Sequence, residues 1–405
     1  MKILSLSTTY PESLNSPKAK FVHLLNKELV KLGAEVTTIV PHSKESSTKQ
    51  VIDGVMIKRF RYLPENLELN TQSIAEAVRQ SKLGIVKILL ITITLFFSTI
   101  SECIRKKPDI IHGHWAFPGG YVASLAAKIF SIKYVVSIHG GEIPLLKKFK
   151  ILQKPVIKCL NKSSYVIVNS NYSKNEFEKM GVQKEKIVLI YPTPNFVKHI
   201  SDSKHLQNFR KKIVPDDSKI ILFCGRLTER KGVEYLIKAI SEIKDKNIHL
   251  VIAGGGGQEN NLKQLTSSLH LNDRVTFFGR ATDSELGLLH DIGDVFVCPS
   301  IIDSQGETEG LGLVIPEAME SKMPVIGTSV GGIPDIIKHE INGILVNEKD
   351  PISIARAIER IFSDNILREK IIKNSQVTIN EFLPETIAIK YFKIFTDISK
   401  QSKNF

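Results

Sequence analysis

The chain has 405 residues, 42% apolar and 24% charged, which fits a soluble globular protein of two or three domains and excludes disordered, collagen-like and multi-span membrane proteins. Its four cysteines form no Cys-x-x-Cys pair, so we expect reduced thiols in a cytosolic compartment and no disulfide scaffold or structural zinc. The net charge of +13 is concentrated in residues 1–200, which hold 29 basic and 14 acidic residues, whereas residues 201–405 hold 26 and 28. This asymmetry predicts that the first half contacts an anionic membrane, an anionic acceptor or nucleic acid, unless its basic surface has no partner.

In chain order, the first half alternates β-rich runs with helical patterns. The segment Met1–Ser7 is too short for a signal peptide and is typical of a first strand. An amphipathic helix is predicted from Phe21 to Val30, before Gly33. The strands predicted in this half are Lys2–Ser7, Val36–Val40, Met56–Phe60, Asp109–His112, Tyr134–Ile138, Tyr165–Asn169 and Ile187–Ile190.

Two segments of the first half suit a membrane. Leu83–Ile100 is apolar over 18 residues with one charge, Lys87, so a spanning helix, a membrane-surface helix and a buried helix are all open, the surface helix being favoured over a spanning one. Lysines also recur every three or four residues from Lys147 to Lys162, with apolar residues between them. They predict a basic amphipathic helix, or two helices that break around Pro155, with an ordinary solvated helix as the alternative.

Residues 196–217 are polar and flanked by prolines, which predicts an interdomain linker. The alternation then restarts, with a helix over Gly232–Lys244 and strands over Lys219–Cys224, His249–Ala253, Arg274–Phe278, Asp294–Cys298, Pro324–Gly327 and Gly343–Val346. This pattern predicts an α/β fold of two Rossmann-like, doubly wound parallel-sheet domains facing a central cleft. We expect the domains at residues 1–197 and 198–385, and a helix at 386–405 that packs back on the first domain.

The strand ending at Gly225 is followed by Arg226, Lys231 and the next helix. Two cations at the carboxyl edge of a parallel sheet suit a diphosphate, since arginine offers a planar fork and lysine a point charge. A pair of solvated surface cations is the alternative.

A second motif holds Glu309 and Glu317 eight residues apart, joined by Gly310-Leu311-Gly312-Leu313 and the start of a helix. The glycines allow close approach to a ligand, the helix start offers N–H groups to phosphate, and the carboxylates can accept hydrogen bonds from sugar hydroxyls. Acids that only complement the helix dipole are the alternative.

Two glycine-rich turns follow other strands of this half, at Gly254–Gly257 and at Gly331-Gly332. The first does not match the dinucleotide fingerprint Gly-x-Gly-x-x-Gly, which disfavours a nicotinamide cofactor. A tight turn close to a nucleotide is the better interpretation.

Three histidines follow or end strands of the first half. His139 precedes Gly140-Gly141 and Glu142, which favours a functional role, whereas His112 and His114 fit an acceptor pocket or simple packing. The three lack a clear fourth ligand, so no metal site is predicted.

These motifs together resemble the retaining GT-B glycosyltransferases of family 4, over nearly the whole chain. The resemblance implies that Arg226 and Lys231 hold the diphosphate of a nucleotide-sugar donor, that Glu309 contacts its sugar and Glu317 its ribose, and that His139 lies by the reacting sugar. It also implies catalytic roles for His139, Arg226, Lys231 and Glu309, and donor contacts from Gly225, Gly254, Arg280, Gly310, Leu311, Gly312 and Leu313. Candidates on the acceptor side are Asn15, Ser16, His114 and Glu142, although the loop around Asn15 lacks the Gly-Gly that such enzymes often have.

The activity expected from this resemblance is transfer with retention from a UDP or GDP sugar to a glycan or lipid-linked acceptor, in cell-surface polysaccharide or glycoconjugate synthesis. No Asp-x-Asp occurs, so we expect that no metal or other cofactor is needed and that Arg226 and Lys231 replace the metal's charge. We expect a cytoplasmic protein peripheral on the inner face of an anionic membrane, with no nucleic-acid partner. The alternatives are a nucleotide-sugar epimerase or hydrolase on the same scaffold and a non-catalytic binding protein.

Overall fold

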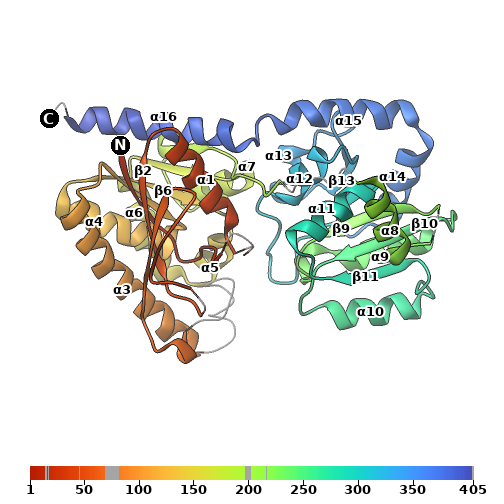
Figure 1. Cartoon of the computed structure of the whole chain (residues 1–405), viewed down its shortest axis with the longest axis horizontal. Coiled ribbons are helices and arrows are strands. Elements are labelled where there is room, and N and C mark those ends of the chain that lie inside the picture. The colour runs from red at the N-terminus through yellow and green to blue at the C-terminus, as the bar shows by residue number, and fades with distance from the viewer. Residues whose placement is uncertain are drawn as a thin grey trace. The chain divides into compact units, whose positions relative to one another are not determined.

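The computed structural model describes residues 1–13, 16, 18–44, 46–68, 82–196, 202–215 and 217–403. The chain forms two compact units, which are treated separately here: Met1–Thr193 with Leu383–Phe405, and Pro194–Phe382 (Figure 1). Each unit is a largely parallel sheet covered by helices on both faces, which confirms the predicted α/β fold class.

The first unit contains a sheet in the order β3-β4-β2-β1-β5-β6-β7-β8, parallel except for the β3–β4 pair. Its strands are β1 Lys2–Leu6, β2 Glu35–Pro41, β3 Lys49–Ile52, β4 Val55–Phe60, β5 Ile110–His114, β6 Lys133–Ile138, β7 Tyr165–Val168 and β8 Ile187–Leu189. The antiparallel edge strand β3 was not predicted, because its four residues, Lys-Gln-Val-Ile, show neither an apolar run of strand length nor an apolar–polar alternation.

Helices cover both faces of this sheet. They are α1 Lys20–Lys31, α3 Lys82–Lys106, α4 Tyr121–Phe130, α5 Glu142–Lys148, α6 Lys150–Lys162, α7 Asn171–Lys179 and α16 Pro384–Lys403, with short turns η1 Glu65–Leu67, η2 Ala116–Gly120 and η3 Lys184–Lys186. One core joins α3, α4, α5 and α6 to one face of the sheet, and another joins α1 and α16 to the opposite face. Successive strand residues serve the two cores in turn, as Ile3 and Leu4 of β1 do.

The lysine-rich segment breaks at a different residue from the one predicted. Helices α5 and α6 meet at Phe149, whose φ of −106° and ψ of 73° are not helical, whereas Pro155 lies inside α6. Pro155 and Ile151, one turn before it, are both exposed, so water can satisfy the carbonyl that a proline leaves without a helical partner. The prediction of a break around Pro155 was therefore wrong.

The second unit contains a parallel sheet in the order β11-β10-β9-β12-β13-β14. Its strands are β9 Lys219–Cys224, β10 Ile248–Ala253, β11 Val275–Gly279, β12 Val295–Cys298, β13 Val325–Thr328 and β14 Ile344–Val346. Its helices are α8 Ser203–Ile213, α9 Val233–Glu242, α10 Glu259–Ser268, α11 Asp283–Ile292, α12 Val314–Glu320, α13 Ile333–Ile336, α14 Pro351–Ser363 and α15 Asn365–Ile379, with the turn η4 Glu229–Lys231.

The stretch predicted as a linker contains helix α8. Its N-cap is Asp202, whose side-chain oxygen accepts hydrogen bonds from the backbone N–H groups of Lys204 and His205 at 3.0 and 3.2 Å. Leu206, Phe209 and Ile213 lie at helical spacing on one side of α8 and are half-buried, but the polar residues around them hid this short apolar stripe. A helix inside this predicted interdomain linker was not expected from the sequence.

Candidate functional site

In the second unit, three strands end side by side in interlocked turns. The N–H of Gly225 donates to Ala253 O at 2.9 Å, and the N–H of Gly254 donates to Gly279 O at 2.7 Å. Gly254 has a φ of +147°, and a Cβ there would stand 1.8 Å from Gly225 O. Only glycine allows this approach, so the turns after β9 and β10 form one rigid floor at the carboxyl edge of the sheet. Arg280 is exposed just after β11.

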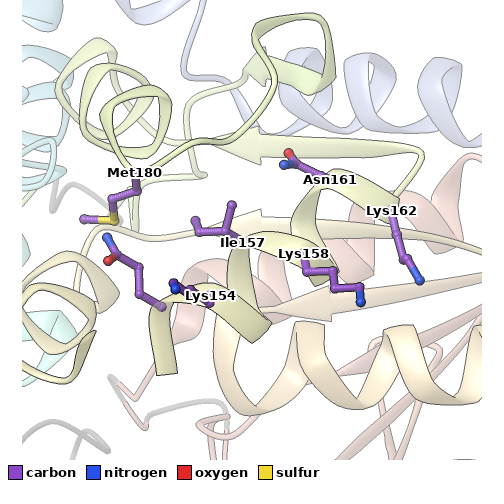
Figure 2. Close-up of a pocket in the computed structure, with 7 residues that line it drawn as sticks. Lys154, Ile157, Lys158, Asn161, Lys162 and Met180 are labelled. Atoms are coloured by element: carbon purple, nitrogen blue, oxygen red, sulfur yellow. The ribbon is translucent and has the colours of Figure 1, made fainter. Parts of the chain in front are cut away.

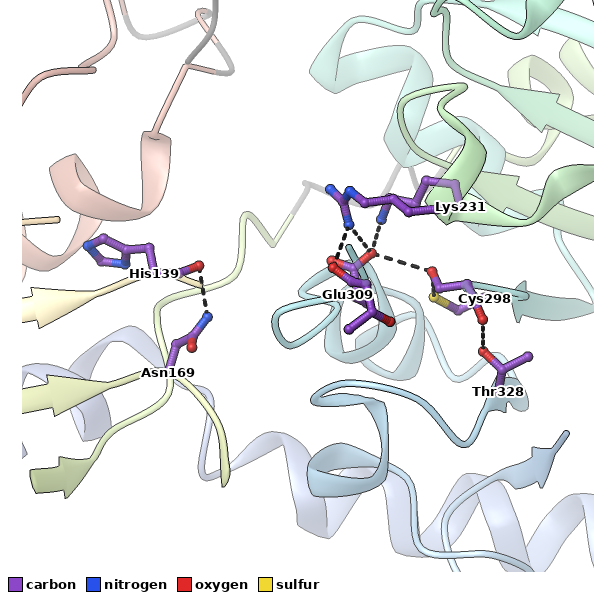
Figure 3. A network of polar contacts seen from close by, with 9 residues as sticks. His139, Asn169, Lys231, Cys298, Glu309 and Thr328 are labelled. Carbon is purple, nitrogen blue, oxygen red and sulfur yellow. Dashed lines mark hydrogen bonds and ion pairs between the residues drawn. The ribbon is translucent and has the colours of Figure 1, made fainter. Parts of the chain in front are cut away.

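Beside these turns, a single carboxylate forms ion pairs with two cations. Glu309 Oε2 lies 2.5 Å from Lys231 Nζ and 3.0 Å from Arg230 Nη1, and it accepts a 3.4 Å hydrogen bond from Ser300 Oγ (Figure 3). Lys231 and Glu309 are only 7% and 8% exposed. The structure therefore brings together two of the predicted residues, Lys231 and Glu309, in one network.

The charge state of this network follows from its partners. Burial acts to raise the pKa of Glu309, but the charges of Lys231, Arg230 and Arg226 outweigh it and hold the pKa at about 2. Arg226 is exposed at the same edge. Three cations thus act on one ionised carboxylate, two of them in direct contact, and together they carry more positive charge than Glu309 alone neutralises.

The backbone on either side of Glu309 is fixed by a second close approach. Gly331 has a φ of +55°, and a Cβ there would lie 1.9 Å from Glu309 O. The N–H of Gly332 donates to the same carbonyl at 3.0 Å. The Gly331-Gly332 turn after β13 therefore sets the position of Glu309, a role distinct from the nucleotide contact that the sequence suggested.

Gly310, Leu311, Gly312 and Leu313 connect Glu309 to α12, with Leu311 buried and Leu313 as the N-cap. The N–H of Ile315 donates to Gly312 O and that of Glu317 donates to Leu313 O. These two N–H groups are used within the chain, and the predicted phosphate contact at this helix start stays a prediction. Glu317 Oε1 accepts a 2.9 Å hydrogen bond from the N–H of Asn195.

In the first unit, His139 follows β6 in an aromatic cluster. Its Nε2 lies 3.2 Å from His114 Nδ1, and the two rings stack with 13° between their planes. The rings of Phe21 and Trp115 lie 4.7 and 4.9 Å from that of His139. Burial lowers the pKa of His139 to about 3 and that of His114 well below its ordinary value, so both imidazoles are neutral.

Hydrogen bonds hold His139 in place from its backbone. Asn169 Nδ2 donates to His139 O at 3.1 Å (Figure 3). Both carboxylate oxygens of Glu142 accept from the N–H of His139 at 3.3 Å, and Oε1 also accepts from the N–H of Ala116 at 3.3 Å. Burial raises the pKa of Glu142 to about 7. Glu142 is therefore a buried support of the His139 turn, with its oxygens engaged by backbone.

The structure places the other candidate residues of the first unit in different surroundings. Ser16 Oγ donates to Glu12 Oε2 at 2.6 Å, within the loop after β1, and Asn15 lies outside the described residues. His112 Nε2 lies 2.8 Å from Ser137 Oγ, whose other neighbour is the hydroxyl of Tyr391, so His112 belongs to the packing beneath α16. In the described ranges, no group of three or more His, Cys, Asp or Glu side chains could hold a metal.

Sequence reasoning missed three contributors. Arg230, next to Lys231, was overlooked because two adjacent cations are typical of a solvated turn. Phe21 was assigned to a helix and Trp115 was given no role, and nothing in their spacing indicates that they contact His139. The sequence feature that could have indicated a role for Arg230 is its position in the same strand-to-helix turn as Arg226.

Two family models match the chain: one described as Glycosyltransferase Family 4 over residues 19–193, and one described as Glycosyl transferases group 1 over residues 205–378. An uncharacterized glycosyltransferase of Methanocaldococcus jannaschii is 33% identical over 393 residues, which cover 94% of each protein. The N-acetyl-alpha-D-glucosaminyl L-malate synthase of Bacillus anthracis is 26% identical over 306 residues, covering 74% of this chain and 77% of that protein.

Solved structures share the fold at lower identity. Anabaena HepE, in complex with UDP and glucose, has a TM-score of 0.74 at 20% identity, covering 98% of this chain and 100% of that one. Sucrose-phosphate synthase from Thermosynechococcus elongatus has a TM-score of 0.79 at 21% identity, covering 98% of both chains. With a full-length relative above 30% identity and family models over both units, the chain belongs to the group 1 family of glycosyltransferases and has the GT-B fold.

Proposed function

We propose that this glycosyltransferase moves a sugar, with retention at the anomeric carbon, from a UDP- or GDP-type donor to a glycan or lipid-linked acceptor in cell-surface glycan synthesis. The observation that carries the proposal is the cation-rich edge formed by Arg226, Arg230 and Lys231 around the ionised Glu309. That excess of positive charge supports binding of the donor's diphosphate. Anabaena HepE, which shares the fold, was solved with UDP and with UDP-glucose.

The same cations supply catalysis in this proposal. Negative charge grows on the leaving diphosphate as the sugar departs, and fixed cations stabilise that charge with little reorganisation. Lys231 and Arg230 are already oriented by Glu309, and Glu309 in turn offers its second oxygen to a sugar hydroxyl. We expect the reaction to need no metal ion, because these side chains provide the charge that a metal would.

His139 acts at the reacting sugar as a neutral imidazole. Because its pKa is low, the imidazole stays neutral. It can form a hydrogen bond with a sugar hydroxyl without placing a positive charge beside the developing oxocarbenium ion. Retention then follows from attack on the face that the diphosphate leaves, with the departing phosphate accepting the acceptor's proton. The aromatic rings of Phe21 and Trp115 beside His139 suit the apolar face of a sugar.

The experiment is a transfer assay of the purified chain with a panel of UDP and GDP sugars and lipid-linked or soluble glycan acceptors, read by mass and by proton NMR. The proposal predicts a product one sugar heavier, with the donor's anomeric configuration. Free sugar or an epimer in equal amount with and without acceptor would instead identify a hydrolase or an epimerase. An inverted anomeric centre would contradict retention while leaving transfer intact.

A further inference from the structure

Helices α3, α4 and α6 form one layer on the same face of the first unit's sheet. Side chains of all three belong to a single core with the strands, α4 contacts both α3 and α6, and Figure 1 shows α3 and α4 side by side. Since each helix turns its buried side toward that sheet, their exposed sides share one outer surface. We call this the α3–α4–α6 face.

The α3 part of this face is apolar and open to solvent. Phe97 is 65% exposed and Leu89 58%, with Val86, Ile93 and Ile104 on the same stripe, at spacings of three, four or seven residues. On α4, Ile129 continues the apolar surface at 58% exposed. Meanwhile the opposite stripe of α3 is buried against the sheet. This is the one helix, among the described residues, long and apolar enough to cross a membrane, with 28% of its window buried.

The rest of the face is basic. Together the three helices carry nine lysines and arginines but one acidic residue, Glu102, which is buried and paired with Lys58 and Arg105. A hollow of about 500 Å³ between α4 and α6 is lined by five lysines and, among the described residues, by no carboxylate. The lysines are Lys128, Lys133, Lys158, Lys162 and Lys186.

A second hollow, of about 610 Å³, flanks the other side of α6. Lys154, Lys158 and Lys162, one turn apart along the helix, line it with Ile157 and Met180 (Figure 2). Within the part of the chain that the structure describes, none of these three lysines forms an ion pair. Mutual repulsion between unpaired cations is relieved by a bound anion, so these hollows fit the phosphate of an anionic headgroup.

We propose that the α3–α4–α6 face docks on an anionic lipid bilayer, with the α6 hollows binding lipid phosphate and the exposed stripe of α3 entering the interface. Apolar side chains and lysines on one surface match a bilayer boundary, where acyl chains lie just below charged headgroups. Because α3 packs on the sheet through its other side, it lies along the membrane and does not cross it. The proposal does not depend on the sugar-transfer reaction, since it rests on a different surface.

The test is flotation of the full chain with phosphatidylcholine vesicles that contain or lack phosphatidylglycerol. We expect much tighter binding to the anionic vesicles than to the neutral ones, and binding that is reduced but not abolished at high salt. Replacing Lys128, Lys158 and Lys162 together by glutamine should weaken binding about a hundredfold. The matched control replaces Lys244, Lys246 and Lys373, exposed lysines of the second unit, and should bind as the parent does.

A second variant probes the apolar part. Leu89→Ser with Phe97→Ser should abolish the binding that survives high salt, whereas Ile366→Ser with Val377→Ser, at exposed positions of the second unit, should not. Unchanged melting temperatures of all variants show that their folds are intact. Equal loss in both lysine triples, equal binding to neutral vesicles, or binding to soluble polyphosphate without binding to vesicles would overturn the proposal.

Discussion

Lys231 Nζ and Glu309 Oε2 lie 2.5 Å apart in a buried ion pair between residues 78 positions apart in the sequence. The carboxylate orients the ammonium group, and Arg230 joins from the same turn. Removing one partner of such a pair leaves a buried charge whose desolvation is not compensated. The ion pair therefore stabilises this unit and also holds in place the Lys231 ammonium group that is proposed to bind the diphosphate.

The pH dependence of stability should reveal this pair. The pKa of Glu309 falls from 4.5 to about 2 on folding, so the unfolded chain takes up the proton first as the pH drops. The stabilisation is complete above about pH 5 and is lost as the pH approaches 2, and it amounts to about 3 kcal/mol. Between these pH values, the melting temperature should change less with pH in Glu309→Gln than in the parent. The exposed Glu369→Gln serves as control, and an identical slope in all three proteins would contradict the ionised pair.

Glu142 should give the opposite pH dependence. Burial raises its pKa from 4.5 to about 7 in the folded protein, so the folded state holds the proton more tightly. The stabilisation is present below about pH 4.5 and is lost as the pH rises through 7. We expect Glu142→Gln to reduce the fall in melting temperature between these values, since the amide cannot ionise. The exposed Glu185→Gln should behave like the parent, and an identical pH slope of the melting temperature in Glu142→Gln and the parent would refute the buried, protonatable carboxyl.

A substitution of Arg226 should lower activity with little effect on stability. Its side chain is exposed and acts on Glu309 more weakly than Lys231 and Arg230 do, so Arg226→Ala should lower the melting temperature far less than Glu309→Gln does. Loss of one fixed charge at the leaving group typically costs about 3 kcal/mol in the barrier, or about a hundredfold in kcat. Steady-state kinetics provide the measurement, with Lys244→Ala as control, an exposed lysine just after α9. Near-parental turnover would remove Arg226 from the catalytic set.

Metal independence is tested by transfer in excess EDTA. The cations at the carboxyl edge supply fixed charge, so we expect the same rate with EDTA, magnesium or manganese. Loss of transfer in EDTA, restored by either ion, would show that the side chains do not replace a metal.

Much of the fold could be predicted from the sequence because parallel strands buried on both faces form short apolar runs, as Ile221 and Leu222 do in β9. Helix α8 was missed because its apolar stripe, Leu206, Phe209 and Ile213, is short and lies in a polar stretch. The break at Phe149 depends on local backbone that no residue type signals. In the candidate site, motif order predicted Arg226, Lys231, Glu309 and Glu317, of which the structure brings Lys231 and Glu309 into contact. The contact between Lys231 and Glu309 could not be predicted, because a single sequence records no pairing between distant turns.

The most direct test of the account is calorimetric titration of the chain with UDP, GDP and the corresponding nucleosides. If the cation-rich edge formed by Arg226, Arg230 and Lys231 recognises the diphosphate, one of the two nucleotides binds and its nucleoside binds about a hundredfold more weakly. Arg226→Ala should then remove most of this difference in affinity. Equal affinity for nucleotide and nucleoside, or no binding of either nucleotide, would contradict the account.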